Sequence, residues 1–299
     1  MTAPAPAPPV PVEHPWINSA SWPFAPRWFQ FEGARMHYVD EGRGPVVVLC
    51  HGTPSWGWEW RHVIADLRAD HRVLCLDMLG FGLSDKPPGA DLRPEAQSGR
   101  LAAWMDHLGL ERAHFVVHDF GGPTGLGATL QRPGRIAGLT LLNTFAWDLH
   151  DDPTVRYSSA FFGTPLGRWI YTSFNFSAKV MAPSAWGEKH KRTPEIQRHY
   201  EGPFPTAESR MSTWVFAREL MGSSSFYQRV WDQRATWGRV PSALVWGTAD
   251  PAFGPKYLAR FQEALPDAQV TVLPRAGHFP QEEAPAEVIA ALRANLRRA

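Results

Sequence analysis

Three polar residues in this 299-residue chain have the types and the order that nucleophilic catalysis requires: Asp119, Asp250 and His278. Each follows an apolar run typical of a buried strand, in the stretches "HFVVHD", "ALVWGTAD" and "TVLPRAGH". The carboxyl ends of parallel strands meet at one edge of a sheet, where ligands bind. The sequence therefore predicts a site that combines two carboxylates and an imidazole.

Asp119 is expected to be the nucleophile. A carboxylate with a reference pKa of about 3.9 is already ionised at neutral pH, so it can displace a leaving group from an sp³ carbon. The product is an alkyl ester of Asp119, which is hydrolysed when His278 activates a water molecule. Asp250 orients His278 and stabilises its charged form. For both aspartates the alternative is a purely structural role, because Asp119 precedes two glycines and Asp250 precedes Pro251.

The nucleophile lies in the stretch "VVHDFGGPTG", residues 116–125, where a predicted strand passes into a predicted helix. The order nucleophile, acid, histidine and the sharp strand-to-helix turn are those of the α/β-hydrolase fold. Gly121 and Gly122 are expected to let the backbone turn at φ values that other residues resist. Val117 departs from the small residue usual at the start of this turn.

Several stretches of the chain resemble the haloalkane dehalogenase and epoxide hydrolase branch of the α/β-hydrolases. They are "HGTPSWGWEWR" (51–61), "GFGLSDKP" (80–87), "VHDFGG" (117–122), "WGTADP" (246–251) and "AGHFPQEE" (276–283), together with "YEGPFP" (200–205), which is similar to a segment of dehalogenase caps. The resemblance covers nearly all of the chain after its proline-rich start. It implies an eight-stranded, mostly parallel sheet flanked by helices, with an inserted helical cap and an aspartate nucleophile.

The elements predicted from hydrophobic patterns agree with that architecture. Strands are expected at 28–31, 35–40, 46–50, 72–77, 138–144, 242–250 and 268–274, with a hairpin turn at Glu32-Gly33 and a helix at 94–108. We assign residues 1–25 to a Pro/Ala-rich arm, residues 26–146 and 236–299 to the core domain, and residues 147–235 to the helical cap. The cap range has many aromatic residues and no clear strand, so it is expected to roof the site.

The resemblance also implies how a leaving anion is bound. The oxyanion donors of this fold are the backbone N–H groups of Phe120 and Thr53. Haloalkane dehalogenases typically have Trp after the nucleophile and many have Asn at the second position, so Phe120 removes one halide donor and Thr53 alters another. Each such hydrogen bond contributes about 1.5–3 kcal/mol. Counting back from "PFP" makes Trp169 a candidate replacement donor from the cap.

The missing donor keeps two enzymatic functions open. The first is haloalkane hydrolysis to an alcohol and a halide. The second is epoxide hydrolysis to a diol, in which cap tyrosines protonate the opening ring; the candidates are Tyr157, Tyr171, Tyr200 and Tyr227. A ligand-binding protein without activity is the non-enzymatic alternative, and the intact triad argues against it. Fluoroacetate-type dehalogenases carry Arg after the nucleophile, so Phe120 favours an apolar substrate.

Composition excludes several other classes. The 30 basic and 29 acidic residues nearly cancel, which argues against nucleic-acid and anionic-membrane partners. Cys50 and Cys75 lie in apolar runs and are expected to be buried free thiols in a reducing compartment. No cofactor or metal motif is evident. The sequence predicts a cytoplasmic monomer or homodimer whose partners are a small apolar organic substrate and water.

Overall fold

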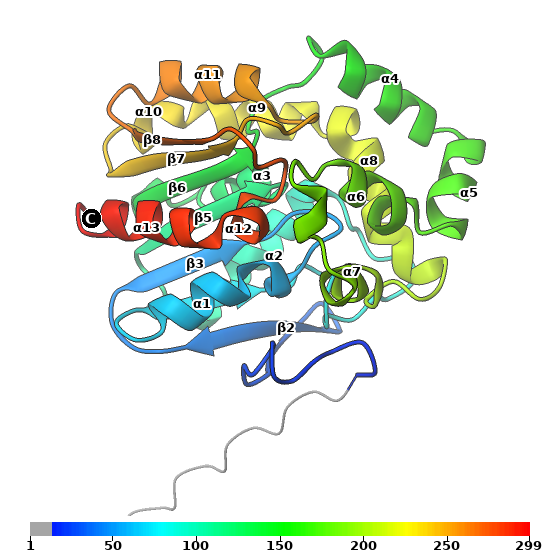
Figure 1. The fold of residues 1–299 in the computed structure, drawn as a ribbon, viewed down its shortest axis with the longest axis horizontal. Helices are drawn as coiled ribbons and strands as arrows, with labels where there is room; N and C mark the ends of the chain where they lie inside the picture. The colour runs from blue at the N-terminus through cyan, green and yellow to red at the C-terminus, as the bar shows by residue number, and fades with distance from the viewer. Residues whose placement is uncertain (1–13) are drawn as a thin grey trace, which may run out of the picture.

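The computed structural model describes residues 14–299, and its centre is an eight-stranded sheet between layers of helices (Figure 1). The strands are β1 (Arg27–Phe31), β2 (Ala34–Glu41), β3 (Val46–Cys50), β4 (Arg72–Leu76), β5 (Ala113–Asp119), β6 (Ile136–Thr144), β7 (Ser242–Gly247) and β8 (Gln269–Leu273). Their order is β1-β2-β4-β3-β5-β6-β7-β8. The first two pairings are antiparallel and all others are parallel, which confirms the predicted sheet.

Helices from both halves of the core cover the two faces of the sheet. They are α1 (Arg61–Leu67), α2 (Pro94–His107), α3 (Gly121–Gly127), α11 (Pro255–Ala264), α12 (Pro280–Glu283) and α13 (Pro285–Leu296). Side chains alternate along a strand, so Val117 joins the core cluster with Trp104 of α2, whereas Val116 joins the cluster with Ile64 of α1 and Leu292 of α13. The predicted turn of the first hairpin is confirmed, with Glu32 at φ 53°.

The chain between β6 and β7 is helical throughout its regular elements. They are α4 (Pro153–Phe162), α5 (Pro165–Ser173), α6 (Ala182–Ser184), α7 (Pro194–Glu201), α8 (Met211–Gly222), α9 (Ser224–Asp232) and α10 (Arg234–Trp237). In Figure 1, α4 to α8 lie beside the carboxyl ends of the parallel strands. The last two helices behave differently, because α9 contacts α3 and α10 contacts β6. The boundaries of the cap at 147 and 235 remain a prediction.

The predicted N-terminal arm, residues 1–25, is described only in its later part. Residues 1–13 lie outside the described part of the chain, but the later part of the predicted arm packs on the core, with Trp22 and Phe24 buried. Asn18 Nδ2 and Ser21 Oγ both donate to Glu195 Oε1 of α7, at 2.8 and 2.6 Å. This segment therefore ties one side of the cap to the core.

Two further expectations concern the cysteines and membranes. Cys50 and Cys75 are free and buried, and burial raises the pKa of both thiols. Between residues 14 and 299, no helix combines the length and the apolar character that a transmembrane span requires.

Candidate active site

β5 ends at Asp119 in the conformation of a nucleophile elbow. Asp119 has a φ of 51°, in the left-handed region that is costly for a residue with a side chain. Because α3 begins at Gly121, the strand, turn and helix present the carboxylate at the carboxyl edge of the sheet. The side chain is nevertheless enclosed, since Asp119 is only 4% exposed.

Glycines near the elbow let neighbouring segments of the chain lie close together. This corrects the prediction that Gly121 and Gly122 supply unusual φ values. Gly121 and Gly122 do not have positive φ; only Asp119 does at this turn. A Cβ at Gly121 would collide with the Cys50 carbonyl oxygen. A Cβ at Gly52, in the loop after β3, would collide with the Asp119 carboxyl group. Two glycines are therefore needed so that the elbow can lie against the end of β3.

His278 and Asp250 are paired as predicted. His278 Nδ1 lies 2.8 Å from Asp250 Oδ2, and both side chains are buried. Asn143 Nδ2 donates to the same Asp250 oxygen at 2.9 Å, and the Ala252 N–H donates to the other oxygen at 2.8 Å. Asn143, at the end of β6, is thus an amide that holds the acid. These contacts leave Asp250 as the carboxylate that orients the imidazole.

The imidazole faces the nucleophile from the other side. His278 Nε2 lies 4.0 Å from Asp119 Oδ2, which is too long for a hydrogen bond. The same carboxylate oxygen accepts a 2.8 Å hydrogen bond from the Thr53 N–H. The predicted donor, the Thr53 N–H, therefore contacts the carboxylate of the predicted nucleophile, whereas the role of the Phe120 N–H remains a prediction.

Charge and burial shift the pKa values of all three groups. Burial raises the pKa of Asp119 to about 6, although His278, His118 and the Thr53 N–H favour its ionised form. Burial disfavours a charged His278, but the charges of Asp250 and Asp119 outweigh it and raise the His278 pKa to about 9. Burial also opposes ionisation of Asp250, but the His278 charge together with the hydrogen bonds from His278, Ala252 and Asn143 outweighs burial and lowers the Asp250 pKa. These shifts favour a protonated His278 between the carboxylates of Asp119 and Asp250.

Phe120 shapes the site and offers no donor from its side chain. Its ring is buried, with centroids 5.3 Å from Phe145 and 4.5 Å from Phe216. Thr53 Oγ1 is buried and has no hydrogen-bond partner among residues 14–299. An unpartnered buried hydroxyl is uncommon in folded proteins. Thr53 therefore brings both an N–H and an available O–H to the neighbourhood of Asp119.

Trp169 does not join this site, which corrects the prediction of a cap halide donor there. Its side chain on α5 is 56% exposed and packs edge-on against Phe174, with centroids 5.4 Å apart. A helix turns by about 100° per residue, so Tyr171, two positions later, points to the buried face. The Tyr171 hydroxyl donates only weakly, to the Met181 sulfur at 3.5 Å. Burial raises the Tyr171 pKa, a hydrogen bond with Ser177 lowers it, and the Asp119 charge raises it further.

The other three candidate tyrosines have different roles. Tyr157 is 69% exposed. The hydroxyl of Tyr200 donates to the Glu282 carboxylate at 3.2 Å, and that of Tyr227 donates to the Glu219 carbonyl oxygen at 2.8 Å. The hydroxyl protons of Tyr200 and Tyr227 are therefore used in hydrogen bonds to residues outside the triad.

A buried Glu59–His118 pair behind the triad escaped the sequence analysis. His118 Nε2 donates to the His278 carbonyl oxygen at 2.7 Å, and His118 Nδ1 lies 3.2 Å from Glu59 Oε2 and 3.1 Å from Gln281 Nε2. All of these side chains are buried. The position of His118 directly before Asp119 was a usable signal, because it must point to the opposite face of β5. Glu59 lies among tryptophans in "WGWEWR" and carried no signal of its own.

The loop of the base is also bound to the cap. The His278 N–H donates to the Ala185 carbonyl oxygen at 2.9 Å. Glu283 accepts hydrogen bonds from the Gly277 N–H at 2.8 Å and the Glu188 N–H at 2.7 Å. The base is therefore held between β5 on one side and cap residues 185–188 on the other.

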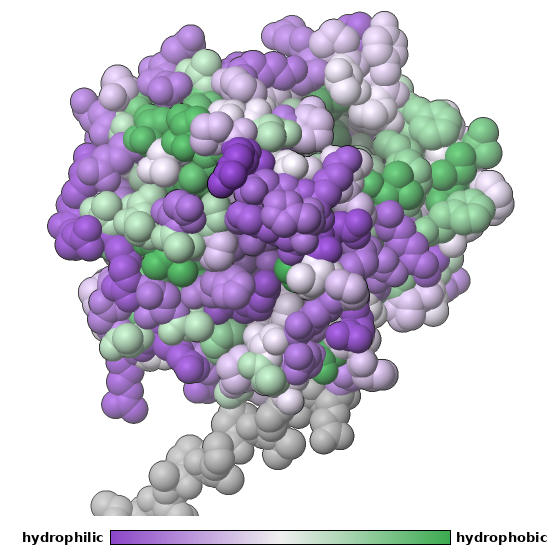
Figure 2. Space-filling model, in the orientation of Figure 1, coloured by the Kyte–Doolittle hydropathy of each residue, from purple (hydrophilic) through white to green (hydrophobic). Residues whose placement is uncertain are grey.

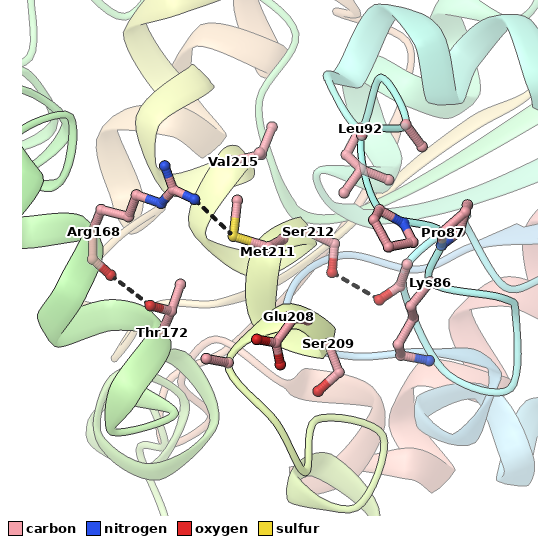
Figure 3. A pocket seen from close by; sticks show the side chains of 15 residues that line it. Lys86, Pro87, Leu92, Arg168, Thr172, Glu208, Ser209, Met211, Ser212 and Val215 are labelled. Atoms are coloured by element: carbon pink, nitrogen blue, oxygen red, sulfur yellow. Dashed lines mark hydrogen bonds between the residues drawn. The ribbon is translucent and has the colours of Figure 1, made fainter.

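A cleft of about 360 Å³ lies at another junction of cap and core (Figure 3). Apolar side chains line much of it, including Leu92, Met211 and Val215. Ser212 Oγ donates to the Gly80 carbonyl oxygen at 2.7 Å and links α8 to the loop that carries the other wall. No triad residue lines this cleft. The described residues also contain no group of three or more His, Cys, Asp or Glu side chains arranged for a metal ion.

Comparison with known proteins places this geometry in a family. The model of the α/β hydrolase fold family matches residues 45–285. Haloalkane dehalogenase 2 of Mycobacterium tuberculosis is 33% identical over 273 residues, which cover 91% of this chain and 94% of that protein. Cis-3-alkyl-4-alkyloxetan-2-one decarboxylase of Shewanella oneidensis is also 33% identical, over 276 residues that cover 89% and 86%.

Solved structures agree with the sequence relatives. The haloalkane dehalogenase DatA from Agrobacterium tumefaciens superimposes with a TM-score of 0.84 at 25% identity, covering 95% of this chain and all of that one. The haloalkane dehalogenase DbeA from Bradyrhizobium elkani gives a TM-score of 0.80, also at 25% identity. Each alignment spans the core and the inserted helices together, because it covers at least nine tenths of the chain.

Proposed function

This chain belongs to the α/β hydrolase fold family and is a haloalkane dehalogenase-like hydrolase, and we propose that it acts through an ester on Asp119. One observation carries the proposal. An aspartate occupies the elbow at φ 51°, and an imidazole paired with a second carboxylate lies 4.0 Å from it. A ligand-binding protein has no use for that combination, because burying three titratable groups together is costly.

In the first step the Asp119 carboxylate attacks the carbon that bears the halogen. A carbon–oxygen bond forms, the carbon–halogen bond breaks, and the halide leaves with the bonding electrons. Phe120 offers no side-chain donor to this anion, so we assign that role to the Thr53 hydroxyl, with Tyr171 as the cap donor. A hydrogen bond to a charged group contributes about 1.5–3 kcal/mol, so one or two such bonds speed departure appreciably.

In the second step His278 Nε2 takes a proton from water, and the resulting hydroxide attacks the carbonyl carbon of the Asp119 ester. The Thr53 N–H stabilises the oxyanion. The intermediate then expels the alkoxide, which receives a proton from His278, and the Asp119 carboxylate re-forms after loss of one proton to solvent. Asp250 stabilises the imidazolium between these transfers.

Ester formation itself prepares the base. The Asp119 charge is one of the causes that raise the His278 pKa to about 9. Once Asp119 is esterified that charge is gone, so the His278 pKa falls. The imidazole thus loses its proton more readily in the step that needs a base than in the resting site.

The raised pKa of Asp119 predicts how the rate of the first step falls at acidic pH, in the acid limb of its pH profile. Because the group must be ionised to attack, the single-turnover rate of bromide release should fall by roughly tenfold per pH unit below about 6. The His278→Phe variant lacks the imidazolium that lowers this pKa, so its limb should shift to higher pH. Rapid mixing with excess enzyme over 1-bromobutane measures both profiles. An unshifted limb in the variant would assign the titration to another group.

The oxetanone decarboxylase relative suggests a second candidate function. Attack of Asp119 on ring carbon 4 of an oxetan-2-one breaks the carbon–oxygen bond of the ring and leaves a carboxylate on carbon 3. Loss of carbon dioxide then forms the carbon–carbon double bond and expels Asp119. The leaving carboxylate stays attached to the substrate, so no free halide requires a donor in the place of Phe120. That feature of the site favours this alternative.

Product analysis separates the candidates. Wild-type protein is incubated separately with 1-bromobutane, styrene oxide and a cis-3,4-dialkyl oxetan-2-one. We expect bromide and butanol from the first. Diol from the second alone would assign epoxide opening with Tyr171 as the donor, and alkene from the third alone would assign decarboxylation. A small apolar substrate and water complete the proposal, together with a cytoplasmic location and a monomeric or homodimeric state.

A further inference from the structure

Exposed apolar side chains gather on one edge of the cap. Of the ten large apolar side chains that are exposed within residues 14–299, seven lie between positions 157 and 181. We define the cap-edge patch by six of them: Phe161, Leu166, Trp169, Phe174, Val180 and Met181. Figure 2 shows hydrophobic surface at the edge of the molecule where Figure 1 places α5. Patches of this kind on a soluble fold mark interaction surfaces.

The charge of the same segment is one-sided. Residues 153–187 contain no Asp or Glu, whereas Arg168 and Lys179 lie among the patch residues in sequence, Arg156 precedes them, and all three are exposed. Arg168 contacts the Met211 sulfur at 3.9 Å and stacks over the Trp214 ring at 4.9 Å, and it forms no salt bridge with a carboxylate of residues 14–299.

Two acidic groups from other parts of the cap reach this segment. Glu201 of α7 pairs loosely with Lys179 at 3.8 Å, and Glu208 lines the same cleft as Arg168. The patch is therefore a hydrophobic surface with a positive border.

A second copy of the chain fits this surface poorly. A twofold contact pairs the patch with an identical surface, so the basic residues of one copy would face a segment that again contains basic residues and no Asp or Glu between positions 153 and 187, and such like-charge contacts are unfavourable. An anionic surface fits better, because it offers an apolar layer for the aromatic side chains and negative groups for the basic ones.

We propose that the cap-edge patch docks on the surface of an anionic lipid bilayer. Trp, Phe and Leu side chains enter the boundary between headgroups and acyl chains, while Arg and Lys contact the headgroups. The balance of charge over the whole chain predicted no such partner, because it averages over this acid-free segment. Arg168 and Thr172 of α5 line the cleft and also lie beside Trp169 of the patch. Docking through the patch would therefore bring the cleft close to the bilayer, in which apolar compounds concentrate.

Vesicle sedimentation tests the proposal with matched variants. Full-length protein is mixed with phosphatidylcholine vesicles that contain or lack phosphatidylglycerol. The wild type should sediment with the anionic vesicles, and added salt should weaken binding. The double variant Leu166→Ser/Trp169→Ser should lower the partition coefficient by roughly tenfold or more. The control Val270→Ser/Val272→Ser changes two exposed apolar residues on β8 and should bind as the wild type does.

Circular dichroism of both variants verifies their folding before binding is compared. Absence of sedimentation with anionic vesicles at low salt would overturn the proposal, as would equal binding by the Leu166→Ser/Trp169→Ser variant. Light scattering gives a further arm: a dimer that this variant abolishes, without vesicle binding by the wild type, would assign the patch to a second copy. Activity enters none of these measurements, so the outcome is independent of the proposed reaction.

Discussion

Replacing His278 with phenylalanine should stop turnover and leave an alkyl ester on Asp119. The first step needs only the carboxylate, whereas hydrolysis of the ester needs His278 as the base. Loss of a general base lowers such a step by roughly 10²- to 10⁴-fold. Incubation with 1-bromobutane should therefore add one butyl group to the intact mass, and peptide mapping should place it on Asp119.

Two details of the site determine how this experiment is done. The imidazolium lowers the Asp119 pKa, so its removal makes the nucleophile harder to ionise, and the incubation belongs at about pH 8.5. The double variant Asp119→Asn/His278→Phe should gain no mass. His190→Phe, at an exposed histidine of the cap, should turn over normally. A butyl group on any residue other than Asp119 would refute the assignment of the nucleophile.

Changing Asp250 to asparagine should have an effect of similar size on the same step. Asp250 accepts from His278 Nδ1 at 2.8 Å and keeps the Nε2 atom free to take a proton from water. An amide at this position favours the opposite tautomer, and in a comparable triad this change costs about 10⁴-fold. Turnover should fall accordingly, while the single-turnover release of bromide continues.

The contrast between the two rates is the diagnostic result for Asp250→Asn. Quenched-flow measurement of bromide gives the first step, and steady-state alcohol formation gives the whole cycle. Asp152→Asn is the matched control, because Asp152 is a buried carboxylate that bonds Lys256 and Tyr257 but contacts no triad residue. If Asp250→Asn slowed both steps equally, Asp250 would act on the nucleophile or on folding rather than on the base.

The contacts of the His278 loop connect the cap to catalysis. The His278 N–H is bonded to cap residue Ala185, and its carbonyl oxygen is bonded to His118 on β5. Residues 14–24 and Glu282 hold the neighbouring helix α7. Movement of this side of the cap would therefore displace the base. On the cleft side, the Ser212–Gly80 hydrogen bond and the packing of Phe81 on Phe216 also join the cap to the core.

The chemistry-bearing residues could be found from the sequence because their signal is local. A buried parallel strand is a short apolar run, and its carboxyl end is where a ligand site forms. That reasoning placed Asp119, Asp250 and His278, and the structure brings them together. Asn143, which cannot carry a charge, also correctly left Asp250 as the partner of the imidazole.

Other features of the site depend on which face of a helix is buried and on which segments lie close together. Trp169 and Tyr171 are two residues apart on α5, and counting along the chain chose the exposed one. The elbow glycines are expected from the sequence to supply unusual φ values, but a Cβ at Gly121 would collide with Cys50 at the end of β3, and a Cβ at Gly122 would collide with Thr144 at the end of β6. The spacing of residues in a sequence does not show which face of a helix is buried, and it does not show how closely two distant segments approach each other.

What the sequence by itself determined was the succession of strands along the chain and the three residues Asp119, Asp250 and His278 at strand ends, all set by short patterns. Only the tertiary structure decided the surroundings: the Glu59–His118 pair, the bond from Asn18 to Glu195, and the unpartnered hydroxyl of Thr53. Glu59 and His118 are separated by 59 positions in the sequence, and Asn18 and Glu195 by 177. The third feature depends on the lack of a hydrogen-bond partner for a buried oxygen within residues 14–299. Such relations arise from the packing of distant segments, so no local pattern predicts them.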